Sequence, residues 1–271
     1  MASILILCML TLTGCQTMQD LLQAMPKPTA EIQSLSLGNI NLKNSTVNIA
    51  IKVNNPYSVS IPNLNLDYAL KTQGIDFISG MVSSDTAIQA RQSSTINIPV
   101  KVSYASLLKL AQTVRPGQVI AYDAHVKLST HVPGVGPLSL PMHKQGQLPV
   151  PMIPKVTISQ VDWGNISLTN TNAVIHLNVT NLNAFTVGMK QLDYNFSIGG
   201  QSVFNSKITT PRQFETNKMQ TLQIPISFKA TRLGFGILNM IRNKKASYSM
   251  SGKLDAQTPY GPITFPFSSH H

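Results

Sequence analysis

Two Asp-Tyr pairs come nearest to a catalytic pattern in this chain. Asp67-Tyr68 and Asp193-Tyr194 lie 126 positions apart, and each follows a leucine. A carboxylate beside a phenol is capable of acid–base chemistry. The structural alternative is that the Asp caps a turn or pairs across strands while the Tyr packs at the sheet margin. We favour this structural alternative and expect the protein to have no enzymatic activity, because the chain has no Gly-x-Ser-x-Gly elbow and no phosphate-binding Gly-rich loop.

The histidines are candidate metal ligands, because histidine nitrogen commonly binds zinc. No pair of histidines combines with a cysteine at the spacing of a zinc site. The only carboxylate close in sequence to His125 and His131 is Asp123. The sequence therefore predicts surface or turn histidines, with no metal site and no cofactor. The histidines are His125, His131, His143, His176, His270 and His271.

The two cysteines, Cys8 and Cys15, lie near the N-terminus, so no disulfide framework is available to the rest of the chain. The apolar run before Cys15 has the length of a signal-peptide core. Its end, Leu12-Thr13-Gly14-Cys15, resembles a bacterial lipobox, which predicts a signal peptide at 1–14 and lipidation of Cys15. No Lys or Arg precedes Cys15, a departure that a misassigned or trimmed start would explain. The alternative is a buried N-terminal helix with an incidental cysteine.

Residues 15–29 are predicted to form the lipid anchor and a tether. Bacterial lipoproteins carry two or three acyl chains, enough for stable membrane attachment, since one chain holds only marginally. Gln16 stands where an inner-membrane retention signal would have Asp. The expected location is therefore the cell envelope, at the outer membrane facing the periplasm.

The chain is basic, with 21 Lys and Arg against 10 Asp and Glu. This surplus favours anionic partners such as phospholipid, although a soluble basic surface without a dedicated partner is an alternative. Arg242, Lys244 and Lys245 follow a predicted helix; they either contact an anionic surface or complement the helix C-terminus. Nucleic acid is not expected, because aromatic residues make up only 6% and most lie at predicted core positions.

One unit occurs twice in the sequence. Between 37–100 and 163–226, 15 of 64 positions are identical without a gap. A period this long indicates a duplicated domain rather than a solenoid. We expect a first domain at 30–148, a stiff Pro-rich linker at 149–154 and a second domain at 155–271.

Within each copy, apolar and polar residues alternate with period two, as at 47–53 and 173–179. Many short strands separated by Gly, Pro, Asn and Ser predict an all-β antiparallel sandwich. One segment per copy has helical spacing instead, so each sandwich should carry one short helix. The expected helix stripes are Leu107, Leu110, Ala111 and Val114 in the first copy, and Leu233, Ile237, Met240 and Ile241 in the second.

A strand, an Asn-Pro motif and a return strand ending near "LDY", followed by "IPV", resemble the late-embryogenesis-abundant type 2 family. Its module is also called WHy, for water stress and hypersensitive response. Asn55-Pro56-Tyr57 stands where that family has Asn-Pro-Asn, whereas the second copy, at Asn181, lacks the proline. The resemblance implies immunoglobulin-like or fibronectin-like sandwiches without enzymatic activity. The matching positions, interpreted as structural, are Asn55, Pro56, Asp67, Tyr68, Asn181, Asp193 and Tyr194.

These features predict a non-enzymatic, lipid-anchored envelope protein with a role in desiccation or water stress. It would bind or shield client proteins or membrane components such as anionic lipid. The alternative is a periplasmic adaptor or a lipid-binding module in an envelope complex. The duplicated module and the resemblance support the first hypothesis, and the stiff linker suits the second.

Overall fold

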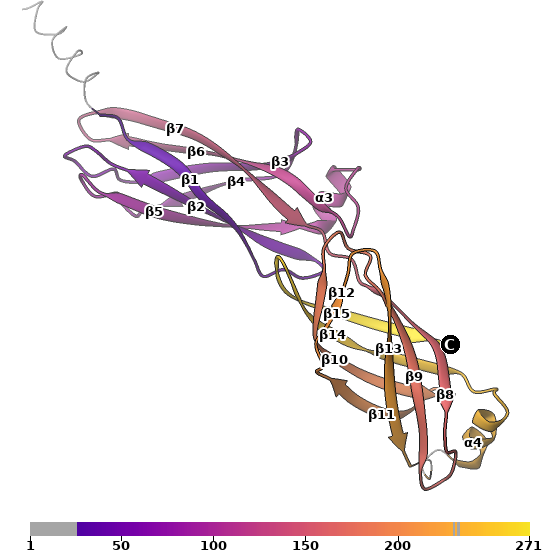
Figure 1. The fold of residues 1–271 in the computed structure, drawn as a ribbon. Helices are drawn as coiled ribbons and strands as arrows, with labels where there is room; N and C mark the ends of the chain where they lie inside the picture. The colour runs from indigo at the N-terminus through magenta and orange to yellow at the C-terminus, as the bar shows by residue number, and fades with distance from the viewer. Residues whose placement is uncertain (1–25, 230, 232–233) are drawn as a thin grey trace, which may run out of the picture. The chain divides into compact units, whose positions relative to one another are not determined.

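The computed structural model describes residues 26–229, 231 and 234–271. The predicted signal peptide, Cys15 and most of the predicted tether lie outside these residues. The described chain is predominantly β-strand, with two short helices, α3 (Tyr104–Leu110) and α4 (Gly234–Arg242). The strands form four sheets, two in each half of the sequence (Figure 1). The expected pair of β-sandwiches, each with one short helix, is confirmed.

The first sandwich contains strands β1 to β7. One sheet has the order β1-β2-β5, and the other has the order β4-β3-β6-β7. The strands are β1 (Thr29–Gly38), β2 (Asn44–Asn54), β3 (Leu64–Thr72), β4 (Ile75–Ser84), β5 (Ser93–Ser103), β6 (Val119–Val132) and β7 (Gly136–Pro149).

The second sandwich contains strands β8 to β15. A three-stranded sheet has the order β13-β9-β8; the other has the order β11-β10-β14-β15, with β12 also pairing with β10. The strands are β8 (Lys155–Trp163), β9 (Thr171–Thr180), β10 (Val187–Ile198), β11 (Gln201–Ile208), β12 (Arg212–Phe214), β13 (Met219–Phe228), β14 (Tyr248–Thr258) and β15 (Gly261–His270).

The two sandwiches share their strand register as well as their strand order. Leu66 pairs with Leu128 between β3 and β6, and Leu192 pairs with Leu254 between β10 and β14. The single Ile61–Ile88 bridge of the first copy corresponds to Val187–Phe214, part of the short β10–β12 ladder. The 126-residue repeat in the sequence is therefore a repeat of the fold, pair by pair.

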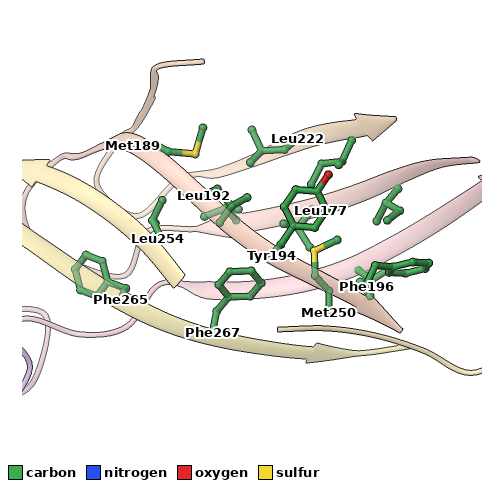
Figure 2. Close-up of a cluster of buried hydrophobic side chains, with 14 of the residues drawn as sticks. Leu177, Met189, Leu192, Tyr194, Phe196, Leu222, Met250, Leu254, Phe265 and Phe267 are labelled. Carbon is green, nitrogen blue, oxygen red and sulfur yellow. The ribbon is translucent and has the colours of Figure 1, made fainter. Parts of the chain in front are cut away.

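The second core lies between two sheets whose inward-facing positions alternate with outward-facing ones. Along β9, every second residue from Thr171 to Val179 is buried. Figure 2 shows the apolar side chains of β10, β14 and β15 pointing toward those of β9 and β13. Phe196, Phe214 and Phe265 are among the largest fully buried side chains. Burial of a side chain of this size contributes about 1.5–3 kcal/mol.

The first helix is shorter than its apolar spacing predicts. α3 begins after Ser103, whose hydroxyl accepts a hydrogen bond from the Ser106 N–H. It ends at Leu110, and the chain turns away at Ala111. Leu107 and Ala111 are buried as expected, but Leu110 is 49% exposed, and Val114 is buried from a turn beyond the helix. The predicted stripe is wrong at Leu110, which lies in the last turn of α3 but faces solvent, and at Val114, which the chain reaches only after it has left the helical path.

The second helix buries a different set of residues from the expected one. Ile237 and Ile241 pack into the core, and Leu238 joins them at 1% exposure. Met240 is 38% exposed, so its placement on the buried stripe is wrong. At about 100° per residue, Ile241 lies between Ile237 and Leu238 in helical projection, whereas Met240 lies on the other side of Ile237, toward solvent. Leu233 lies outside the described residues.

Each three-stranded sheet has an edge strand interrupted by proline. Pro99 lies in β5 and Pro225 in β13, at equivalent positions of the two copies. Proline has no N–H to donate, so it is tolerated at a sheet edge, where that group would face away from the ladder. The retained "IPV" and "IPI" motifs are therefore features of edge strands.

Candidate functional site

The Asn-Pro motif of the first copy holds a buried amide. Asn55 is fully buried at the end of β2. Its Oδ1 accepts a hydrogen bond from the Tyr57 N–H at 3.0 Å, which closes a local turn. Its Nδ2 donates to the backbone oxygens of Val59, Ile88 and Gln89 at 2.8–3.1 Å. The side chain thereby ties the β2–β3 loop to a segment 33 residues further along the chain.

Asn181 makes the equivalent bonds to two of these three backbone oxygens in the second copy. Its Nδ2 donates to the backbone oxygens of Phe185 and Phe214, the counterparts of Val59 and Ile88. Its Oδ1 accepts from the N–H of Asn183 at 3.0 Å. The bonds need only the amide, because the replacement of Pro56 by Leu182 leaves them unchanged. We call Asn55 and Asn181 the amide clamps; their polar atoms are committed to the fold.

The two Asp-Tyr pairs also point to structural roles. Asp67 lies 3.4 Å from Lys127 on the neighbouring strand, and Asp193 lies 3.3 Å from Lys253 at the equivalent register. All four side chains are at least 30% exposed. Solvent-exposed pairs of this kind contribute little to stability. They are positioned to set the pairing of the strands.

The tyrosines that follow these carboxylates pack along the same sheets. Tyr68 lies across Gly80 on β4, where an added Cβ would come within 2.5 Å of the phenol oxygen. Tyr194 faces Ser206 at the equivalent position of the second copy. Burial raises the pKa of Tyr194, and a hydrogen bond with Ser206 opposes part of that rise. The raised pKa keeps the Tyr194 phenol protonated near neutral pH.

An open hollow of about 720 Å³ lies over the Asp193–Lys253 pair. It also includes Asn195, Asn205 and Lys207 from the neighbouring strands. The hydrogen bond that Lys253 donates to Asp193 and the nearby charge of Asp255 raise the pKa of Lys253. The hollow is therefore an open depression in which Asp193 and Lys253 are already paired with each other.

The histidines of the described residues are spread over both sandwiches. His125 and His143 stack with their ring centroids 6.0 Å apart, and His176 lies 2.8 Å from Asp162. Hydrogen bonds from Gln160 and then from His176 lower the pKa of Asp162. Within residues 26–229, 231 and 234–271, no group of three or more His, Cys, Asp or Glu is arranged to hold a metal ion.

The predicted basic residues lie together at the end of α4. Arg242 donates from Nη2 to the backbone oxygen of Ile166 at 3.1 Å, which holds the β8–β9 loop against the helix. The Lys245 N–H donates to the Met240 oxygen, and the Lys244 N–H donates to the Ile241 oxygen. This is the Schellman arrangement that closes a helix C-terminus. Arg242, Lys244 and Lys245 are all exposed.

Sequence reasoning missed two features near these residues. Phe235, in the first turn of α4, is 71% exposed. The second is Trp163, which is only partly buried and donates from Nε1 to the Tyr248 hydroxyl at 3.1 Å. It borders a hollow of about 690 Å³ that also includes Phe204 and Ile226. The sequence could have indicated that Phe235 is exposed, because it lies between two glycines and ahead of the basic residues that end the helix.

No helix among the described residues has both the length and the apolar character needed to cross a bilayer.

The matches to known proteins fall on the two copies of the module. The model for the family described as late embryogenesis abundant protein, LEA_2, matches residues 50–146 and again residues 176–270. A desiccation protectant protein Lea14 homolog from Glycine max is 27% identical over 129 residues, covering 48% of this chain and 85% of that protein. A desiccation-related protein from Craterostigma plantagineum is 26% identical over 125 residues, covering 46% and 83%. Each of these relatives therefore corresponds in length to one copy of the module.

A solution structure from Arabidopsis thaliana is also similar. It is 27% identical, covers 48% of this chain and 85% of its own, and superposes with a TM-score of 0.40. The family matches follow the two halves that share strand order, register and amide clamps. The chain belongs to the LEA_2 family of late embryogenesis abundant proteins and carries two copies of the module in tandem.

Proposed function

We propose that this chain is a non-enzymatic water-stress protein of the cell envelope, anchored by lipid on Cys15 to the outer membrane and facing the periplasm. The observation that carries the proposal is the tandem LEA_2 module, whose relatives include a desiccation protectant and a desiccation-related protein. In this role the two sandwiches shield neighbouring proteins or membrane components as water is lost.

The outer faces of the three-stranded sheets suit such shielding. On β13, Thr221, Gln223 and Ser227 are exposed, and the Thr221 hydroxyl donates to the Asn178 Oδ1 on β9. On β5, Thr95 and Asn97 occupy the matching rows. Neutral hydroxyl and amide groups both donate and accept hydrogen bonds. They supply partners to a client surface that is losing its water, beside the exposed Lys52 and Lys101 of the first sheet.

The protective activity is tested by drying a client enzyme with and without the full chain. The Cys15→Ser variant is used, so that attached acyl groups do not contribute. The expected result is retained client activity above that given by an equal mass of an unrelated folded protein. Equal recovery in both samples would contradict a protective role.

The anchor is tested separately, by measuring the intact mass of the protein isolated from host membranes. A mature N-terminus at Cys15 carrying acyl mass is expected, and a Cys15→Ala variant should lack that mass. An unmodified chain beginning at Met1 would overturn the lipoprotein assignment and leave the drying assay unaffected.

A second candidate function, carriage of an apolar ligand, rests on the hollow beside Trp163. Its volume of about 690 Å³ lies within the range of small-molecule sites, about 300–1,000 Å³. Phe204, Ala173 and Ile226 give it an apolar lining that suits an acyl chain. Native mass spectrometry of detergent-free protein should then show added lipid mass. Trp163→Leu, which installs the residue found at Leu37 in the first copy, should reduce that mass. Wild-type protein without added mass would exclude this function.

A further inference from the structure

The exposed Phe235 gives α4 an apolar side chain on the face opposite its packed one. Ile237, Leu238 and Ile241 fill the core side of the helix, yet Phe235 is 71% exposed and Met240 is 38% exposed. A single exposed apolar residue is ordinary on a protein surface. Here two of them lie on one nine-residue helix, and their surroundings are basic.

The charge around this helix has one sign. Phe235 and Arg242 are seven residues apart, about two helical turns, so they lie on the same exposed face. Lys244 and Lys245 follow directly and are exposed. The sequence has no Asp or Glu between Thr216 and Leu254, and none in the β8–β9 loop that Arg242 holds. An aromatic residue flanked only by cations is the composition of segments that lie in a membrane interface.

The backbone at Lys244 adds a third observation. Lys244 has a φ of 55°, the left-handed conformation that closes the Schellman turn. Glycine is the usual residue there, because a Cβ is strained in that conformation. The chain therefore carries a lysine at a position where folding alone favours glycine. Such a local outlier justifies asking what the side chain does for function.

We propose that α4 and the residues following it, from Phe235 to Lys245, form a docking surface for anionic phospholipid. The Phe235 ring enters the headgroup region, while Arg242, Lys244 and Lys245 face lipid phosphates. The occupant is assigned by the unopposed positive charge together with the exposed aromatic ring. This inference rests on the proposed function, because the lipid anchor proposed above would hold the chain beside a bilayer.

The test measures binding of the full chain, with Cys15→Ser to remove lipidation, to vesicles of phosphatidylcholine mixed with phosphatidylglycerol. Vesicles of phosphatidylcholine alone are the reference, and binding is followed by co-flotation. Each basic residue near an anionic surface accounts for about a five-fold change in binding. The pair Lys244→Gln and Lys245→Gln should therefore weaken binding by about 25-fold. Phe235→Ser should weaken it by about ten-fold.

Matched controls change the same chemistry elsewhere. Lys52→Gln with Lys101→Gln removes two exposed charges from the first sandwich, and Met81→Ser removes an exposed apolar side chain from β4. These variants should bind as the parent does. Lys244→Gly retains the turn, so its expected five-fold loss cannot be attributed to unfolding of the helix.

Three results would overturn the proposal: no preference for the anionic vesicles, equal losses in the controls, or unchanged binding in the α4 variants. If the chain showed no preference for anionic vesicles but bound an acidic protein, the partner would be that protein and the proposal would be overturned. Because vesicle binding is measured without drying, it can fail while client protection succeeds, and the reverse also holds.

Discussion

The two sandwiches are alike in their cores and differ at their helices. Both place an amide clamp after the second strand of the module and an Asp–Lys pair at the same register. In the first copy, α3 follows β5 directly behind a Ser103 cap. In the second copy, α4 begins six residues after β13 and ends in a left-handed lysine. The bonds that define the module persist after duplication, whereas the helix end has diverged.

The largest effects are expected from truncating equivalent core residues. Leu70 and Phe196 are fully buried counterparts. Leu70→Ala should destabilise its module by about 2–5 kcal/mol, and Phe196→Ala by about 3–5 kcal/mol. Trp163, the sole tryptophan, lies in the second module, so its fluorescence during urea unfolding follows that module.

The comparison predicts that Phe196→Ala shifts the Trp163 transition and that Leu70→Ala does not. Circular dichroism, which follows strands of both modules, should detect both variants. An equal shift of the Trp163 transition by Leu70→Ala would show instead that the two modules unfold as one unit.

The amide clamps should be equivalent in the two copies. Asn181→Ala removes the partners of two buried carbonyls and one N–H. Leaving such groups unsatisfied is expected to lower the free energy of unfolding by about 2–4 kcal/mol. Asn55→Ala should lower it by a similar amount, as measured by circular dichroism in urea.

Asn205→Ala, at an exposed position, is the control and should change stability by less than about 0.5 kcal/mol. A clamp variant no less stable than this control would show that the recurring asparagines are kept for another reason.

Alkaline pH should reveal a buried phenol of the first sandwich. Burial raises the pKa of Tyr122 to about 12, while in the unfolded chain a tyrosine ionises near 10. The neutral phenol is therefore favoured by the fold, and its contribution is complete below pH 10. Between pH 10 and 12 the unfolded state loses its proton first, so stability falls by about 2–3 kcal/mol.

Tyr122→Phe should remove this part of the alkaline loss when unfolding free energy is measured at successive pH values. An unchanged pH profile in the variant would assign the loss to other groups.

The smallest effect concerns the diverged helix end. Lys244→Gly relieves the left-handed strain, which is about 1 kcal/mol, and gives up a favourable charge at the helix C-terminus of about 0.3–1 kcal/mol. The variant should therefore be as stable as the parent or slightly more stable in thermal unfolding. A clear loss of stability would mean that Lys244 is kept for folding, and the comparison between the helices would lose its functional meaning.

The sequence was sufficient for the parts of the fold that depend on local pattern and repetition. Period-two alternation predicts β2 and β9, and the repeat predicts that the copies share one register. The helices were harder, because Leu110 and Val114 match a helical stripe by spacing, although Leu110 is exposed at the last position of α3 and Val114 lies beyond the end of that helix. The helix boundary depends on the turn at Ala111, which the pattern does not encode.

The site was less predictable than the fold. The clamp bonds of Asn55 join residues 33 and 34 positions apart, so they become visible only once the strands are paired. Phe235 was missed because an apolar residue beside a helical stripe is ordinarily assigned to the core. Lys244 carries no sequence signal for its left-handed backbone, since that conformation is expected of glycine or asparagine.

The prolines of the edge strands have a consequence under dehydration. As water leaves, proteins are concentrated, and free strand edges become templates on which copies of a chain polymerise. Pro99 and Pro225 interrupt the donor rows of β5 and β13. These two edges are thereby hindered from pairing with the edges of other copies when a protein is concentrated by loss of water.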